Sequence, residues 1–324
     1  MKPFAYVNPA NVQEAVASLS SERGRVMPLA GGMDLVSLMK DYIVSPERVV
    51  NVKGLDASIA DGPNGGLRIG AAARLVDLAA HARVAKEYRA LAQAAAEVGT
   101  PQIRNHGTVG GNLLQRPRCW YYRNEEFPCL KKGGARCYSV DGENQFHAIL
   151  GGGPCHIVHP SSLAVPFMAF GATFHVVGPR GERAVPADEF FELPDRNMYG
   201  ESVLRPDELV TAVTLPAATG RQSATYEVRF KQSHDWPIAF ASVTLQLQGK
   251  LVTDARVVMG AVAPIPWRAQ SAEAVLKGQA VDEMVAVKAA EAALERAQPM
   301  SQNAYKVQVA KTAVKRAILS AAAV

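Results

Sequence analysis

Four cysteines gathered in one polar stretch are the residues of this sequence most suited to chemistry. Cys119, Cys129, Cys137 and Cys155 lie within 37 consecutive residues, among Arg, Lys, Asn and Gly residues. Cysteines that fill a hydrophobic core would instead be spread over buried strands and helices. Four thiolates are what one iron–sulfur cluster or one tetrahedral zinc ion requires. The stretch is therefore a candidate metal centre.

The spacing of these cysteines does not select the metal. Structural zinc sites usually pair their ligands closely, whereas the gaps here are nine, seven and seventeen residues. The gaps also differ from those of the ferredoxins. A cluster held by a long loop needs no close pairs, because the cluster itself fixes the sulfur positions. An iron–sulfur cluster, a zinc ion, and disulfides or free thiols all stay open, with His147, His156 and His159 as alternative ligands.

A first glycine segment has residue types that could bind a phosphate group. In residues 28–36, a predicted strand runs into Gly31 and Gly32 and then into a predicted helix. Glycines at such a turn let a ligand approach the backbone, whose N–H groups can bind a pyrophosphate. The segment is not G-x-G-x-x-G, so the dinucleotide fold of the NAD enzymes is not indicated. By itself, the segment is better explained as a tight turn between strand and helix.

A second glycine segment, at residues 102–113, has similar properties. It places Gly107, Gly110 and Gly111 beside Thr108 and Asn112, whose side chains can bond an anionic or carbonyl-rich ligand. This segment alone is as ambiguous as the first. The two together favour a nucleotide cofactor, without identifying the nucleotide.

Hydrophobic periodicity predicts the elements that must position these segments. Residues 101–162 lack periodicity and are predicted to form a long functional loop. The strands after this loop are expected to be antiparallel. Strands are predicted at 4–7, 25–30, 48–52, 67–69, 173–177, 209–215, 226–230, 241–247 and 255–261. Helices are predicted at 11–19, 35–42, 75–80, 88–98, 272–276, 284–297 and 303–322, and the turn-rich stretch 61–66 indicates a nearby subdomain boundary.

Composition excludes several classes of function. The chain has 324 residues, of which 48% are hydrophobic, enough for two domains with sizeable cores. Its net charge of +5 comes from scattered Lys and Arg residues, so no nucleic-acid partner is expected. The apolar run at 163–177 is interrupted, so no membrane span is expected either. Without a signal peptide, we expect a cytoplasmic protein, or a periplasmic one exported with a signal-bearing partner.

The motifs PLAGGMDLV, QIRNHGTVGGNLL, HPSSLAVPFMAFGA and FKQ occur in this order at residues 28–36, 102–114, 159–172 and 230–232. With them, the chain resembles the flavoprotein component of the xanthine dehydrogenase and carbon monoxide dehydrogenase family, the molybdenum hydroxylases. The four-cysteine insertion is also seen in the beta subunit of 4-hydroxybenzoyl-CoA reductase. The segments RCWYYRNEEFPC and QNAYKVQVAKTAVKRAI make the chain more similar still to the FAD subunits of periplasmic aldehyde oxidoreductases.

The resemblance implies an α+β fold. It has an FAD-binding domain of the vanillyl-alcohol-oxidase type with two subdomains, followed by a C-terminal α+β domain. In this sequence the subdomains would be residues 1–57 and 58–218, with an iron–sulfur insertion at 115–158. The C-terminal domain would cover residues 222–324.

The resemblance also implies the cofactor contacts. The FAD pyrophosphate should be wrapped by Leu29, Ala30, Gly31, Gly32, Met33, Asp34 and Leu35, and by Thr108, Gly110, Gly111 and Asn112. Lys231 should reach the flavin, and Ser162 stands where the family often has an aspartate. Met33 replaces a common hydroxyl or Asn residue, so its side chain is not expected to bond a phosphate. Asp34 is a candidate to tune the flavin, or else an acid placed at a helix N-terminus. The four cysteines should carry a [4Fe–4S] cluster.

The implied function is electron transfer, with no catalytic residue on this chain. The substrate would be hydroxylated on a large molybdenum-cofactor subunit, and electrons would pass through a small [2Fe–2S] subunit to FAD here and then to an external acceptor. The three subunits would form a heterotrimer or its dimer. Two rival hypotheses are a zinc-stapled binding module and a self-contained flavin oxidase that uses His106 or His234 as its base.

Overall fold

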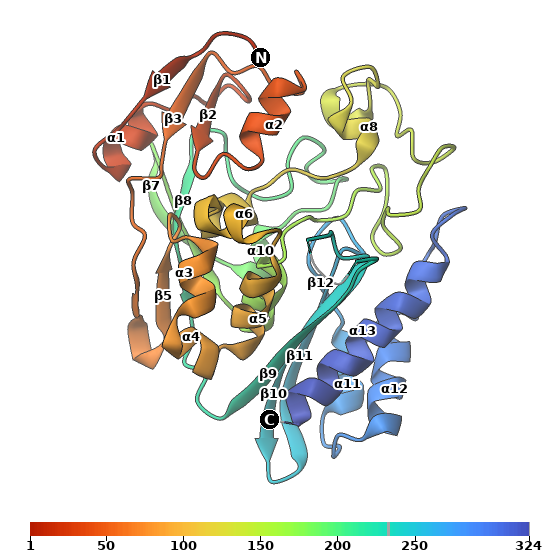
Figure 1. Ribbon diagram of the computed structural model, residues 1–324. Coiled ribbons are helices and arrows are strands. Elements are labelled where there is room, and N and C mark those ends of the chain that lie inside the picture. Colours follow the sequence, from red (N-terminus) through yellow and green to blue (C-terminus); the bar gives the residue numbers. More distant parts are fainter. Residues whose placement is uncertain (232–233, 324) are drawn as a thin grey trace.

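Three β-sheets follow one another along the chain in the computed structural model, which describes residues 1–231 and 234–323 (Figure 1). The first sheet is parallel, in the order β1 (Ala5–Val7), β3 (Arg48–Asn51) and β2 (Val26–Leu29). The helices α1 (Val12–Ala17) and α2 (Leu35–Lys40) form the connections. The side chain of Asn11 accepts a hydrogen bond from the Glu14 N–H at 2.9 Å and so begins α1.

The second sheet is antiparallel and has five strands, three of which come from far along the chain. Their order is β4 (Ile59–Asp61), β5 (Leu67–Gly70), β8 (Leu209–Leu215), β6 (Thr173–Gly178) and β7 (Gly181–Pro186). Its main core is shared with the surrounding helices α3 (Leu75–Ala80), α4 (Ala82–Glu87), α5 (Arg89–Glu97), α9 (Ala164–Ala169) and α10 (Ala187–Phe190). Strand β8 lies between β5 and β6 and completes this sheet, after which the chain continues into the third sheet.

The third sheet is antiparallel and has helices packed against it. Its order is β12 (Trp267–Arg268), β11 (Leu251–Gly260), β10 (Ala239–Gln248) and β9 (Arg221–Val228). The helices are α11 (Gln270–Leu276), α12 (Glu283–Ala293) and α13 (Tyr305–Ala322), drawn in blue in Figure 1. Their alanine-rich faces form a second hydrophobic core with β10 and β11. Helix α5 of the preceding unit packs against β9 and joins the two units.

The α+β class is confirmed, and most of the predicted elements occur. The predicted loop at 101–162 is wrong for its first part, where α6 (Pro101–His106), α7 (Val109–Leu113) and α8 (Trp120–Arg123) form. These helices are too short to show periodicity, and the signal that they do carry is capping: Thr100 caps α6 and Thr108 caps α7. Two short 3-10 helices, Pro63–Gly65 and Leu130–Lys132, were also not predicted.

The strand predicted at 226–230 occurs, but both of its predicted ends lie too far along the chain. Strand β9 begins at Arg221 and ends at Val228, and the side chain of Phe230 is 68% exposed. The apolar run at 163–177 forms helix α9 and strand β6. The three sheets lie within residues 5–51, 59–215 and 221–268. The division into domains at 57/58 and 218/222 stays a prediction.

The start of α13 fixes the segment that carries the cysteines, hereafter the cysteine insertion (residues 115–158). The buried Lys306 ammonium donates to the carbonyl oxygens of Phe146, His147 and Ala261 at 2.9, 3.0 and 2.8 Å. The side-chain amide of Asn303, also buried, donates to the His147 carbonyl at 3.1 Å. Burial lowers the pKa of Lys306 to about 7, while three carbonyl acceptors favour its charged form.

Replacement of Lys306 by methionine should destabilise the protein, because it leaves buried carbonyl oxygens without donors. We expect the free energy of unfolding to fall by about 2–3 kcal/mol, measured by urea denaturation. Lys311→Met on the same helix is the control and should change stability by less than about 0.5 kcal/mol. Equal effects of the two substitutions would contradict this role for Lys306.

Candidate functional site

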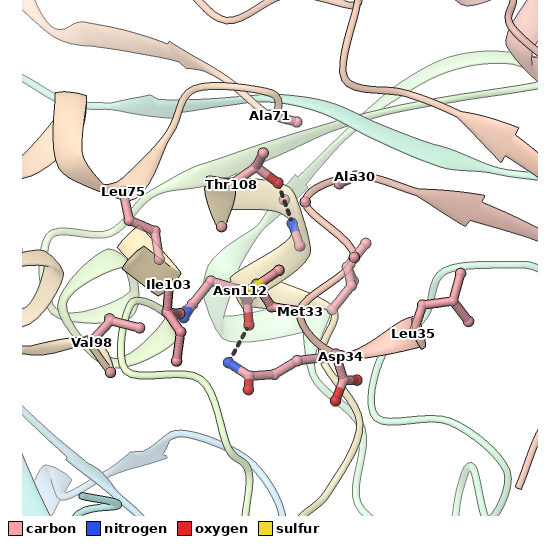
Figure 2. Close-up of a pocket in the computed structure, with 18 of the residues that line it drawn as sticks. Ala30, Met33, Asp34, Leu35, Ala71, Leu75, Val98, Ile103, Thr108 and Asn112 are labelled. Carbon is pink, nitrogen blue, oxygen red and sulfur yellow. Dashed lines mark hydrogen bonds between the residues drawn. The ribbon is translucent and has the colours of Figure 1, made fainter. Parts of the chain in front are cut away.

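A cavity of about 400 Å³, hereafter the glycine cavity, opens where the three sheet units meet. Its wall combines the first glycine segment, the second glycine segment and the chain that enters β10 from the third unit. Figure 2 shows side chains from the first two of these segments facing the same space. Of the predicted site residues, those that line the cavity are Ala30, Gly31, Gly32, Met33, Asp34, Leu35, Thr108, Gly110, Gly111, Asn112 and Ser162.

The two glycine segments touch through their backbones. A Cβ atom on Gly31 would lie 2.0 Å from the carbonyl oxygen of His106, so only glycine fits at this contact. Gly32 has a φ of +76°, a left-handed conformation that other residues rarely adopt. The prediction that these glycines allow a close backbone approach therefore has a physical basis in the fold.

The amides of the first segment are available to a ligand. Within residues 1–231 and 234–323, no acceptor lies within hydrogen-bond reach of the N–H groups of Gly31, Gly32 and Met33. All three residues line the glycine cavity. Successive N–H groups without a partner at such a turn form a site suited to an anion. A pyrophosphate fits this donor set.

Three amides of the second segment are already used within the protein. The N–H groups of Val109 and Gly110 donate to the carbonyl oxygens of Ala73 and Ala71 at 2.9 and 2.8 Å. The Gly111 N–H donates to Thr108 Oγ1 at 3.1 Å, one of the dashed bonds in Figure 2. Gly110 and Gly111 lie in α7 rather than in an open loop. The N–H groups of Val109, Gly110 and Gly111 are therefore not available to a ligand, and the side chains of this segment are its main polar groups.

Asn112 and Ser162 are the polar side chains that the second unit presents to the cavity. Asn112 Oδ1 accepts hydrogen bonds from Ser161 Oγ at 2.7 Å and from the Leu163 N–H at 3.3 Å. These bonds fix the amide group and leave its Nδ2 as the group that can donate to a ligand. Ser162 is 7% exposed, and its hydroxyl group has no partner within the described ranges 1–231 and 234–323. Both side chains are therefore able to donate to a ligand.

Two predicted contacts do not line the glycine cavity. Leu29 is the last residue of β2, and Lys231 is exposed, with its N–H 3.3 Å from Asp235 Oδ2. Gln232 of the FKQ motif lies outside the described residues. His234 does line the cavity, with Nδ1 3.1 Å from the Gly99 carbonyl oxygen, whereas His106 does not. A contact between Lys231 and a flavin stays a prediction.

Asp34 has the most extensive polar contacts of the first glycine segment. Its carboxylate accepts from the Arg116 N–H at 2.7 Å, from Arg118 Nη1 at 2.5 Å and from Arg123 Nη2 at 2.6 Å. It makes no cap bond to α2, although it stands at the N-terminus of that helix. Burial alone would raise the pKa of Asp34, but Arg118, Arg123 and the Arg116 N–H outweigh burial and lower it. Asp34 is therefore ionised at neutral pH.

Arg116 and Arg118 line the glycine cavity and were not predicted. Each makes a further contact across the fold: Arg116 pairs with Glu201 at 3.2 Å, and the Arg118 guanidinium lies 4.6 Å from the Trp236 ring centroid. Burial lowers the pKa of Arg118 to about 10. Their position directly after the second glycine segment was the one sequence signal that could have placed them at the cavity. Nothing in the sequence indicates that they bind Asp34.

All four cysteines line one small pocket, hereafter the cysteine pocket. None of them forms a disulfide, so the disulfide alternative is wrong, whereas free thiols stay an alternative. Cys119 Sγ lies 3.2 Å from His147 Nε2, and Cys137 Sγ lies 3.1 Å from Ser139 Oγ. The remaining wall is largely aromatic and aliphatic: Tyr121, Tyr122, Leu130, Tyr138 and Ile157, together with Lys131.

The thiols of this pocket differ in acidity. A hydrogen bond with Cys155 lowers the pKa of Cys137 to about 5, and the same bond raises the pKa of Cys155. Burial raises the pKa of Cys119 to about 11 and lowers the pKa of His147 to about 4.

Of the three candidate histidines, only His147 lines the cysteine pocket. His159 is buried elsewhere, 4.8 Å from the Phe191 ring. Trp120, which follows Cys119 in the sequence, contacts the rings of Tyr121, Phe146 and His147. Among residues 1–231 and 234–323, no three His, Cys, Asp or Glu side chains converge closely enough to hold a single metal ion. In the same residues, no helix is both long enough and apolar enough to cross a membrane.

Comparisons with known proteins match both parts of the chain to FAD-binding subunits. Residues 2–218 match the FAD binding domain of molybdopterin dehydrogenases, and residues 224–321 match the C-terminal domain of carbon monoxide dehydrogenase flavoproteins. The chain is 34% identical over 317 residues to the aldehyde oxidoreductase FAD-binding subunit PaoB of Escherichia coli, covering 96% of each chain. It is 28% identical over 323 residues to the carbon monoxide dehydrogenase medium chain of Hydrogenophaga pseudoflava, covering 98% of this chain and 96% of that one.

A solved structure shows the same fold. Carbon monoxide dehydrogenase from Hydrogenophaga pseudoflava superimposes with a TM-score of 0.77 and 29% identity, over 100% of this chain and 99% of that chain. The fold predicted from the motifs is thus confirmed. The chain belongs to the family of FAD-binding subunits of the molybdopterin dehydrogenases, oxidoreductases built from several subunits.

Proposed function

We propose that this chain binds FAD in the glycine cavity and passes electrons from a partner's iron–sulfur centres to an external acceptor. The observation that carries the proposal is the meeting of the two glycine segments, with the N–H groups of Gly31, Gly32 and Met33 left without partners. Bound FAD supplies a group that accepts electrons one at a time and releases them in pairs. The protein supplies binding, orientation and the electrostatic surroundings.

The chain's own residues suit the parts of this cofactor. The three free amides bind the pyrophosphate, and Asn112 and Ser162 donate hydrogen bonds to the rest of the molecule. Thr108 orients the turn by accepting the Gly111 N–H. Residues 234–237 of the third unit close the far wall of the cavity, and Lys231 lies close by in sequence. No proton transfer by the chain is required, so we assign no catalytic residue.

Substrate oxidation belongs to a partner in this proposal. The relatives are named as subunits of aldehyde oxidoreductase, carbon monoxide dehydrogenase and xanthine dehydrogenase. By analogy, this chain assembles with a large molybdenum-cofactor subunit and a small [2Fe–2S] subunit as a heterotrimer or its dimer. Its location, cytoplasmic or periplasmic with a signal-bearing partner, stays a prediction.

We further propose that the cysteine pocket holds a [4Fe–4S] cluster on Cys119, Cys129, Cys137 and Cys155. The support is the convergence of four reduced thiols from distant positions of the insertion on one shielded space. Aromatic walls keep water away from such a cluster and influence its potential. His147 lies beside Cys119 and, in this proposal, is a neighbour of the cluster rather than a ligand.

Replacement of Gly31 by alanine should weaken FAD binding. The new Cβ would lie 2.0 Å from the His106 carbonyl oxygen and would push the two glycine segments apart. We expect the dissociation constant for FAD to rise by about tenfold or more, because each 1.4 kcal/mol of lost contact is a factor of ten. Titration of the flavin-free chain, followed by flavin fluorescence, measures this change.

Gly54→Ala is the matched control for this prediction. An added Cβ at Gly54 meets nothing within 4 Å, and Gly54 does not line the glycine cavity. Its FAD affinity should equal that of the wild type. Unchanged affinity in Gly31→Ala would be evidence against the proposed FAD site.

Removal of a single cysteine should abolish iron binding. The anaerobically purified wild-type chain should contain about four iron and about four acid-labile sulfide atoms, with the broad visible absorbance of a cluster. Cys129→Ala should contain far less of both, whereas His147→Gln should keep its iron. Zinc in place of iron, or loss of iron only in His147→Gln, would refute the four-cysteine cluster.

A further inference from the structure

The carboxylate of Asp34 connects the two proposed cofactor sites directly. Asp34 follows the free amides of Gly31, Gly32 and Met33 in the chain, and Figure 2 shows it beside Met33 at the glycine cavity. Its hydrogen bonds come from Arg116, Arg118 and Arg123, which follow it by 82, 84 and 89 positions in the sequence. All three belong to the cysteine insertion. The side chain of Asp34 is 16% exposed and that of Arg123 is 15% exposed. The pair is therefore shielded from water, which strengthens the interaction.

On the side of the cysteine pocket, the connection runs through α8. Cys119 stands at the N-terminus of this helix, and its carbonyl oxygen accepts the Arg123 N–H at 2.9 Å. The Arg123 guanidinium also donates to the carbonyl oxygens of Pro117 and Arg116, at 2.8 and 2.9 Å. Its position is thus fixed by the turn that carries the first cysteine.

Hydrophobic packing supports the same connection. Leu38, on the helix that follows the first glycine segment, is 1% exposed and packs in one cluster with Tyr122, Cys129 and Cys119. Figure 1 shows α2 and α8 side by side at this position. A change in the shape of the cysteine pocket would therefore alter the packing of α2 as well as the contacts of Asp34.

A second ionic link begins at another residue of the pocket. Lys131, which lines the cysteine pocket and is buried, pairs with Glu201 at 2.8 Å, and Glu201 pairs with Arg116 at 3.2 Å. The Arg116 N–H is itself one of the donors to Asp34. Two chains of contacts from the cysteine pocket thus end at the same carboxylate.

We propose that Asp34 is a positioning residue that couples occupancy of the cysteine pocket to FAD affinity. The inference rests on the proposed FAD and cluster sites and goes beyond them. A filled cysteine pocket fixes α8, Arg123 and Arg116, which hold Asp34 and, with it, the free amides in the conformation that binds a pyrophosphate. An empty pocket leaves residues 115–131 less constrained, and the first glycine segment loses its external anchor. Because such coupling is reciprocal, bound FAD also retains the cluster.

The experiment measures the dissociation constant for FAD in the full chain, with its iron in place and after iron removal by a chelator. In the wild type, we expect iron removal to weaken FAD binding by about tenfold. Asp34→Asn and Arg123→Met should bind FAD weakly in both forms, with less than about a twofold dependence on iron. Arg123→Lys, which keeps the charge, should recover part of the dependence. Loss of iron to the chelator should be slower when FAD is bound.

Asp188→Asn is the matched control. Asp188 also bridges two arginines, Arg256 and Arg268, but it lines neither the glycine cavity nor the cysteine pocket. This variant should show the full iron dependence of the wild type. A role of Asp34 in stability alone would lower the unfolding temperature without removing the iron dependence.

Several outcomes decide the proposal. Equal FAD affinity of the iron-loaded and iron-free wild type would overturn the coupling, as would a full tenfold dependence in a folded Asp34→Asn variant. If that variant does not fold, Arg123→Met and the wild-type comparison decide instead. A chain that binds no iron would refute the cluster proposal and the coupling together. The iron count distinguishes that result from a chain that binds iron but has the same FAD affinity with and without it.

Discussion

The backbone contact between Gly31 and the carbonyl of His106 is the constraint on which the rest of this structure depends. It brings a turn of a small parallel sheet against a turn of a larger antiparallel unit, and the glycine cavity lies beside the contact. Any side chain at position 31 would separate the two turns. The amides that remain free there face a cavity closed on another side by the third unit. The fold thus builds the glycine cavity from three segments, none of which encloses it alone.

Polar contacts, rather than regular elements, hold the cysteine insertion. Only α8 and one 3-10 helix occur between residues 115 and 158 in the described chain. The segment is fixed from outside by Asp34 at one end and by Asn303 and Lys306 at the other. Buried charges are stable only when their hydrogen bonds are satisfied, and both Asp34 and Lys306 have three partners. The segment QNAYKVQVAKTAVKRAI, which begins just before α13, therefore has a physical role: its first residues anchor this insertion.

The arrangement suits a protein that must hold two cofactors in a fixed relation. Helices α2 and α8 share one hydrophobic cluster, and Asp34 of the first glycine segment pairs with Arg118 and Arg123 of the cysteine insertion. The stack of Arg118 on Trp236 extends this contact to the third unit. Electron transfer depends on distance and surroundings, so a rigid connection between the sites serves the proposed function. The chemistry itself would come from the cofactors.

The sequence by itself determined those features that depend on local interactions, namely several helices and strands and the residue types of the two candidate sites. Periodicity predicted α3 and β8 with the bounds that the structure has, Leu75–Ala80 and Leu209–Leu215. The glycine and cysteine patterns located both candidate sites, because close backbone approach and thiolate ligation require particular residue types. Tertiary structure alone decided how these parts are used. Whether an amide is free depends on distant partners: the carbonyl oxygens of Ala71 and Ala73 accept the amides of Gly110 and Val109, whereas nothing in the described chain accepts those of Gly31, Gly32 and Met33. Likewise, the arginines that neutralise Asp34 lie more than 80 positions away, and no local pattern identifies the partner of a charge.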